Sequence, residues 1–114
     1  MLSLPSSTRV FVCLTATDMR SSFDKLSALT QQVLKQDPLS GHLFVFLNRV
    51  RTHLKVLYFD RTGQAIWYKR LERGTFRVPA VEELTYRELV CMLEGLEVRN
   101  LRYSRANINI SSAQ

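Results

Sequence analysis

The side chains that could carry out catalysis or bind a metal are few and widely separated. The 114 residues include two histidines, His42 and His53, and two cysteines, Cys13 and Cys91. If the strands expected around the histidines pair across a short turn, Leu47 faces His53, and the imidazoles lie roughly 15–20 Å apart at about 3.3 Å per residue. Neither cysteine has the CxxC or Cys–His spacing of a zinc site. We therefore expect no metal and no cofactor.

The ten acidic residues do not form the cluster that two-metal phosphoryl transfer requires. Asp18 and Glu88 are placed to cap helices, Asp37 and Asp60 lie in expected turns, and no acid lies in the middle of a predicted strand. The four glycines are dispersed, so there is no glycine-rich phosphate loop. The pattern indicates that the chain is not an enzyme.

Basic and aromatic residues in the middle of the chain indicate binding instead. Residues 47–77 hold eight cations against two acids, and the segment after residue 98 adds three arginines. Cations contact phosphates, and aromatic rings stack on bases or are covered by guanidinium groups. Duplex DNA is the first expected partner. The candidate residues for binding nucleic acid or a partner are Arg49, Arg51, Lys55, Tyr68, Lys69, Arg70, Arg73 and Arg77.

Two other interpretations of this block stay open. Protein interfaces are also rich in Tyr, Trp and Arg, so the same residues fit an interaction adaptor that does not bind DNA. The third interpretation is a strand end whose cations are solvated and bind nothing.

The block must be positioned by strands, which β-branched and apolar runs predict at 8–14, 42–47, 53–59 and 64–71. Residues 60–63 have the composition of a hairpin turn, with Gly63 free to adopt positive φ. Pairing Phe59 with Gln64 places Lys55 opposite Tyr68 on one face of the sheet, with Arg70 beside them. The other face then collects core residues: Leu54, Val56, Trp67 and Leu71.

Two helices are expected to accompany these strands. An apolar stripe predicts a helix over 19–36, capped by Asp18 and ended by Asp37-Pro38. The second, over 86–95, begins with a capping box formed by Thr85 and Glu88, and ends at Gly95. Leu84 and Leu89 are spaced as a hydrophobic staple.

The predicted fold class is α+β, with a mainly antiparallel sheet of four or five strands and two helices in a single two-layer domain over residues 1–103. The helices are expected side by side. Strand 42–47 is apolar on both faces, so either a second copy, in a homodimer, or the second helix covers one of them. Residues 104–114 are expected to form a disordered or peripheral tail. No segment has the pattern of a signal peptide or the roughly 20 apolar residues of a membrane span, so we expect a cytoplasmic chain with no membrane partner.

Several short strings are distributed along the chain: TDMR and FDKL at 17–20 and 23–26, DP and SGHLFVF at 37–38 and 40–46, KVL and WYKRLERGTF at 55–57 and 67–76, and LEGL at 93–96. In these strings the chain resembles the small accessory protein, TnpB or Orf2, of the insertion-sequence-sixty-six family of bacterial transposable elements. The resemblance covers roughly residues 4 to 99.

This resemblance implies a non-catalytic accessory role in transposition, beside a separate transposase that carries the acidic catalytic triad and is a second expected partner. The chain departs from the family pattern at several positions. Ser21-Ser22 replaces Lys-Gly, the turn at 47–51 is less basic and poorer in glycine, Tyr58-Phe59 replaces a tryptophan pair, and Val78 replaces a tryptophan. A diverged, inactive copy is therefore a further alternative.

Overall fold

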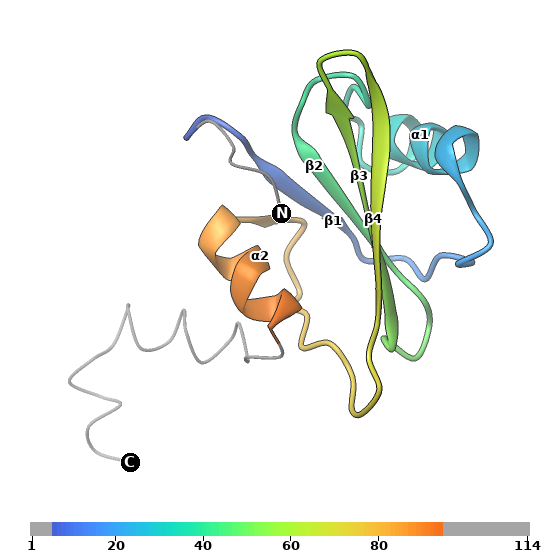
Figure 1. The fold of residues 1–114 in the computed structure, drawn as a ribbon, viewed down its shortest axis with the longest axis vertical. Coiled ribbons are helices and arrows are strands. Elements are labelled where there is room, and N and C mark those ends of the chain that lie inside the picture. The colour runs from blue at the N-terminus through green and yellow to red at the C-terminus, as the bar shows by residue number, and fades with distance from the viewer. Residues whose placement is uncertain (1–5, 95–114) are drawn as a thin grey trace.

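The computed structural model describes residues 6–94 and shows a five-stranded mixed sheet with two helices (Figure 1). The strands are ordered β4-β3-β2-β1-β5, and only β1 and β2 pair in parallel. The α+β class with a mainly antiparallel sheet is thus confirmed. Along the chain the elements are β1 (Val10–Cys13), α1 (Phe23–Gln32), β2 (Leu43–Leu47), β3 (His53–Asp60), β4 (Gly63–Arg70), β5 (Glu83–Leu84) and α2 (Tyr86–Leu93).

The helices cover opposite faces of the sheet, so the prediction of two layers with neighbouring helices was wrong. In Figure 1 the sheet stands between α1 and α2. One core cluster joins Val45 and Val56 to Leu89 and Met92 of α2, and the other joins Phe44 and Phe46 to Leu26 of α1. All five residues of β2 are buried, which requires cover on both faces. Of the two ways to cover β2, the second helix is the one observed.

The first helix is shorter than its apolar stripe predicts. Its N-cap is Ser22, not Asp18, and its buried residues are Leu26 and Thr30, whereas Phe23 is 42% exposed. Asp18 instead accepts hydrogen bonds from the backbone N–H and the guanidinium of Arg20. Serine and aspartate hydrogen-bond to nearby backbone or side-chain donors outside helices, and here that local turn replaces the first turn of the predicted helix.

The β3–β4 hairpin has the predicted register, with Phe59 opposite Gln64 and Lys55 opposite Tyr68. Two details of the turns differ from prediction. In the hairpin turn Arg61, with φ 43°, adopts the left-handed conformation, and Gly63 does not. Between β2 and β3, Leu47 pairs with Leu54 rather than His53, because the Asn48 N–H donates to the His53 carbonyl and extends the ladder by one position.

The start of α2 follows the sequence pattern closely. The Thr85 side chain accepts from the Glu88 N–H at 3.1 Å, and the Glu88 carboxylate accepts from the Thr85 N–H at 2.9 Å. Leu84 and Leu89 are both buried in the α2-side core, as a hydrophobic staple requires. Three predicted features lie outside the described residues: the helix end at Gly95, the three arginines after residue 98, and the tail over 104–114. No helix within 6–94 has the length and apolar character to cross a membrane.

Candidate nucleic-acid interface

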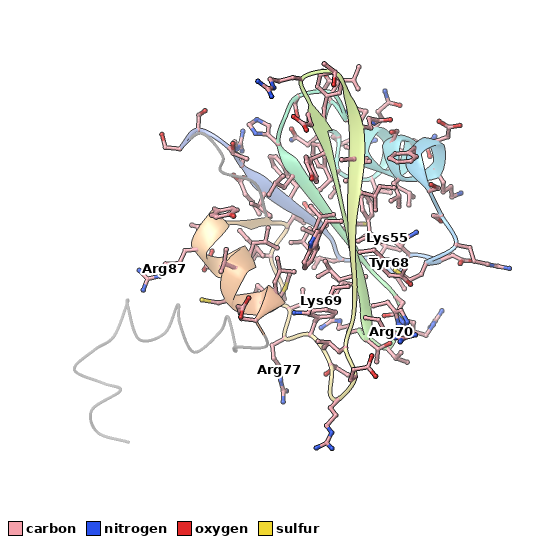
Figure 2. All side chains as sticks on the ribbon, in the orientation of Figure 1. Lys55, Tyr68, Lys69, Arg70, Arg77 and Arg87 are labelled. Carbon is pink, nitrogen blue, oxygen red and sulfur yellow. The ribbon has the colours of Figure 1, made fainter. Side chains whose placement is uncertain are left out.

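One end of the sheet carries a row of exposed arginines. There the β2–β3 turn lies beside the segment that leaves β4, since the Leu71 N–H donates to the Thr52 carbonyl at 2.9 Å and the Phe76 N–H to the Arg51 carbonyl at 2.8 Å. We call these exposed side chains the basic rim, and Figure 2 labels two of them. The basic rim consists of Arg49, Arg51, Arg70, Arg73 and Arg77.

The basic rim keeps nearly all of its charge. Of its five arginines, all within the described part of the chain, only Arg70 forms an ion pair with an acid, Glu72 at 3.4 Å, and both side chains are well exposed. An exposed pair at that distance contributes little and is readily exchanged for another anion. A line of guanidinium groups of this kind suits phosphate oxygens, which they can contact in a bidentate manner.

Side-chain hydrogen bonds shape the turn that presents Arg49 and Arg51. The Asn48 side-chain carbonyl accepts from the N–H groups of Thr52 and His53 at 2.9 and 3.0 Å. Arg51 is held in the left-handed region with φ 60°, an uncommon conformation for a residue with a side chain. This conformation is stabilised by the hydrogen bond from the Phe76 N–H to the Arg51 carbonyl and by the hydrogen bonds to the Asn48 side chain. Arg49 and Arg51 therefore project from a well-defined turn.

Two of the candidate residues, Lys55 and Lys69, form hydrogen bonds within the protein and do not belong to the basic rim. Lys55 is 9% exposed, and its ammonium donates to the Ser21 carbonyl at 2.7 Å on the α1 face. Lys69 lies on the α2 face, where its ammonium donates to the Leu93 carbonyl at 2.6 Å (Figure 2). Alternation along β3 and β4 separates them, and each satisfies a backbone carbonyl.

Tyr68, the remaining candidate, lies on the α1 face and is 51% exposed. The Lys55 ammonium sits 4.9 Å from the centroid of its ring, and the His53 ring is 6.0 Å away. The structure thus brings Lys55, Tyr68 and Arg70 together on one side of the hairpin, as the register predicts. Beside them is a shallow depression of about 360 Å³, lined by Thr17, Asp18, Met19, Asn48, Arg49, Val50, His53 and Tyr68.

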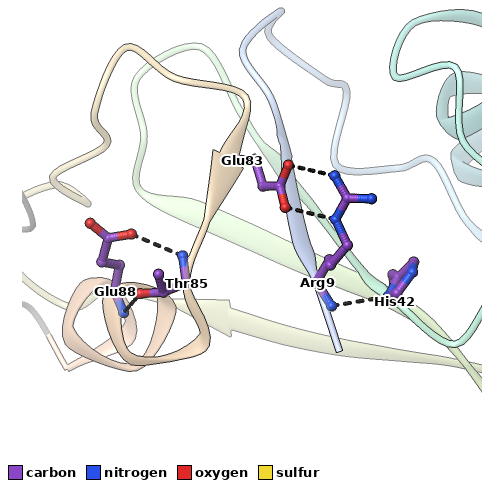
Figure 3. Close-up of polar contacts among 5 residues, drawn as sticks. All are labelled: Arg9, His42, Glu83, Thr85 and Glu88. Atoms are coloured by element: carbon purple, nitrogen blue, oxygen red, sulfur yellow. Dashed lines mark hydrogen bonds and ion pairs between the residues drawn. The ribbon is translucent and has the colours of Figure 1, made fainter. Parts of the chain in front are cut away.

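A polar cluster lies at the N-terminal end of β1, and the sequence alone did not predict it. Arg9 forms two hydrogen bonds of 2.8 Å with the Glu83 carboxylate, and its backbone N–H donates to His42 Nδ1 at 3.0 Å (Figure 3). The guanidinium lowers the pKa of Glu83, and the carboxylate raises the pKa of Arg9. The pairing of β1 with the two-residue β5 brings Glu83 to Arg9, and the parallel pairing of β1 with β2 brings His42 there. No local motif predicts so short a strand.

Two other titratable groups, Asp18 and Cys13, also have shifted pKa values. The Arg20 guanidinium, by hydrogen bonding, holds the pKa of Asp18 at about 2. Burial raises the pKa of the Cys13 thiol, which makes it a poor nucleophile. Between residues 6 and 94, no three His, Cys, Asp or Glu side chains are grouped so that they could hold a metal ion.

Comparison with known proteins identifies relatives along nearly the whole described chain. The model of a family described as IS66 Orf2 like protein matches residues 8–103. Uncharacterized protein y4hO of Sinorhizobium fredii (strain NBRC 101917 / NGR234) is 38% identical over 104 residues, which are 88% of this chain and 90% of the relative. Uncharacterized protein y4jC of the same strain is 30% identical over 93 residues, 78% and 80% of the two chains. No solved structure matches.

Proposed function

The chain belongs to the IS66 Orf2-like family of transposition accessory proteins, and from that premise we propose that it binds duplex DNA through the basic rim without catalysing a reaction itself. The observation that carries the proposal is the grouping of five exposed arginines at one end of the sheet, with a single acidic side chain paired to any of them in the described chain. Such a surface attracts a polyanion and contacts its phosphates without reading base sequence.

The contacts of the basic residues support a distinction between arginines that are free to bind DNA and lysines that bond within the protein. The turn and the β4 exit are connected through backbone hydrogen bonds, so the arginines are presented by two segments that lie side by side. The ammonium groups of Lys55 and Lys69 are each bound to a backbone carbonyl within the protein. We therefore place the DNA contacts on the basic rim rather than on every basic residue of the central block.

The proposal is tested by reversing two charges of the basic rim. Arg73→Glu with Arg77→Glu should lower duplex affinity at least tenfold, because two attractive contacts become repulsive, while circular dichroism stays unchanged. The matched control is Lys25→Glu with Arg87→Glu, which changes the net charge equally on α1 and α2. Figure 2 shows Arg87 pointing away from the labelled arginines of the basic rim. Equal losses in both double variants would contradict a localised interface.

A second candidate function is an adaptor that binds the element's transposase through the same end of the molecule. The observation in its favour is the apolar surface next to the arginines, where Val50 is 61% exposed and Tyr68 is 51% exposed. Under this function the wild-type chain co-purifies with the transposase after nuclease treatment, and Val50→Asp abolishes the interaction. Binding that disappears with the nuclease would indicate that DNA bridges the two proteins.

A further inference from the structure

The depression beside Tyr68 combines features that the binding of duplex DNA does not require. It lies on the α1 face, next to the basic rim, and its volume of about 360 Å³ is within the range of small-ligand sites. Val50 and Tyr68, two of its lining residues, are among the most exposed large apolar side chains of residues 6–94. A rigid duplex presents stacked, paired bases and cannot place a base face in this space.

Interactions within the protein already fix the Tyr68 ring. Lys55 lies 4.9 Å from its centroid, and the Lys55 ammonium is itself anchored to the Ser21 carbonyl at 2.7 Å. Across the strand, the His53 ring flanks it at 6.0 Å with an interplanar angle of 37°. A ring that is held in place while about half exposed loses little conformational entropy when a ligand stacks on it.

His53 offers a hydrogen-bond donor at the same place. The Asn48 carbonyl oxygen is occupied by two backbone N–H groups, so its amide nitrogen donates to Thr52 Oγ1 at 3.0 Å. Thr52 Oγ1 lies 2.8 Å from His53 Nδ1 and can donate to it. With Nδ1 as the acceptor, the proton of the neutral imidazole is assigned to Nε2, which none of the described hydrogen bonds uses.

The charges around the depression favour an anion at its edge. Arg49 lines it, and Arg70 lies opposite His53 in the β3–β4 ladder. The only acid among the lining residues is Asp18, and the Arg20 guanidinium pairs with its carboxylate at 2.6 Å. The site therefore joins an aromatic face, a hydrogen-bond donor and two cations.

We propose that this depression binds an unpaired base of single-stranded DNA. The base stacks on Tyr68 beside Val50, His53 Nε2 donates to a base carbonyl oxygen, and Arg49 and Arg70 contact the flanking phosphates. The inference rests on the proposed function, since two arginines of the basic rim serve both modes of binding. It adds that the protein binds melted or frayed DNA, in which a base can leave the helix.

The test compares a short fluorescent oligothymidylate with a flush-ended duplex by anisotropy. Tyr68→Ala should weaken binding of the single strand by about 5- to 150-fold, the usual effect of removing one stacking ring, and change duplex binding less than about threefold. Tyr68→Phe should keep both affinities. Tyr68→Leu, which still covers Lys55, should behave like the alanine variant. The control is Tyr86→Ala, which removes an exposed tyrosine of α2 and should change neither affinity.

Unchanged single-strand affinity in Tyr68→Ala, or an equal loss for both DNA forms, would overturn the inference. If duplex binding still depends on Arg73 and Arg77 in that case, the proposed function stands without it. If the wild-type chain binds neither DNA form, both proposals fail together.

Discussion

Removing the ammonium of Lys69 should weaken the fold without weakening DNA binding. That ammonium donates to the Leu93 carbonyl, one of the last carbonyls of α2, which have no partner inside the helix. A hydrogen bond to a charged group contributes about 1.5–3 kcal/mol, and a cation at a helix C-terminus about 0.3–1 kcal/mol. Because these two free energies describe the same contact, they are not added. The conformational entropy lost when the lysine side chain is ordered reduces the net stabilisation.

We therefore expect Lys69→Met to lower the free energy of unfolding by about 1–2 kcal/mol, because methionine keeps the apolar stem but loses the donor. Lys69→Glu should cost about 2–3 kcal/mol, since its carboxylate would face the negative end of the helix. For a domain of this size, 1 kcal/mol corresponds to a shift in Tm of about 4–8 °C. Urea unfolding followed by circular dichroism measures the change, and the slope m should remain constant.

DNA affinity of the folded variants then separates structure from binding. Lys69→Met should bind duplex DNA within about twofold of the wild type at low temperature, where both are folded. The opposite result would be a Lys69→Met variant that is as stable as the wild type but has lost DNA binding. Lys69 would then be a phosphate contact, and the basic rim would be wrongly defined.

Three further predictions concern individual residues. Thr85→Ala should cost about 1 kcal/mol of stability in urea unfolding, while Thr85→Ser, which keeps the N-cap oxygen, should cost much less. Arg51→Gly should be stable to within about 1 kcal/mol of the wild type, because glycine adopts the left-handed conformation freely, whereas Arg51→Val should be destabilised by about 1–2 kcal/mol. In an NMR titration, Asp18 should have its midpoint at about 2 and move toward 3.8 in Arg20→Ala. Its pKa is lowered in the folded state, so the stabilisation by the Asp18–Arg20 pair is complete above the unfolded pKa and is lost as pH falls through about 2.

The parts of the fold that the sequence predicts best are those determined by local chemistry. The capping box depends on Thr85 and Glu88 three positions apart, and the hairpin register depends on a short turn and strict alternation. Both were therefore predictable, and with them the juxtaposition of Lys55, Tyr68 and Arg70. The arginines of the basic rim lie near one another because the β2–β3 turn and the β4 exit are at the same end of the paired strands.

What the sequence could not reveal depends on contacts between distant segments. The parallel pairing of β1 with β2 and the placement of α2 on the face opposite α1 are global choices, and β5 is too short to leave a pattern. The ammonium groups of Lys55 and Lys69 have carbonyl partners 34 and 24 positions away. The sequence alone does not separate these two lysines from the exposed cations, and only the packed structure shows that each donates to a backbone carbonyl.

The salt dependence of duplex binding reports how many phosphates the basic rim neutralises. If three to five arginines of the basic rim neutralise phosphates, log affinity should fall linearly with log salt, with a slope between about −2.7 and −4.5. Neutralising one of them, in Arg73→Gln, should reduce the magnitude of the slope by about 0.9, whereas Arg87→Gln on α2 should leave it unchanged. A slope near zero, or equal changes in the two variants, would show that the basic rim is not the DNA-binding surface.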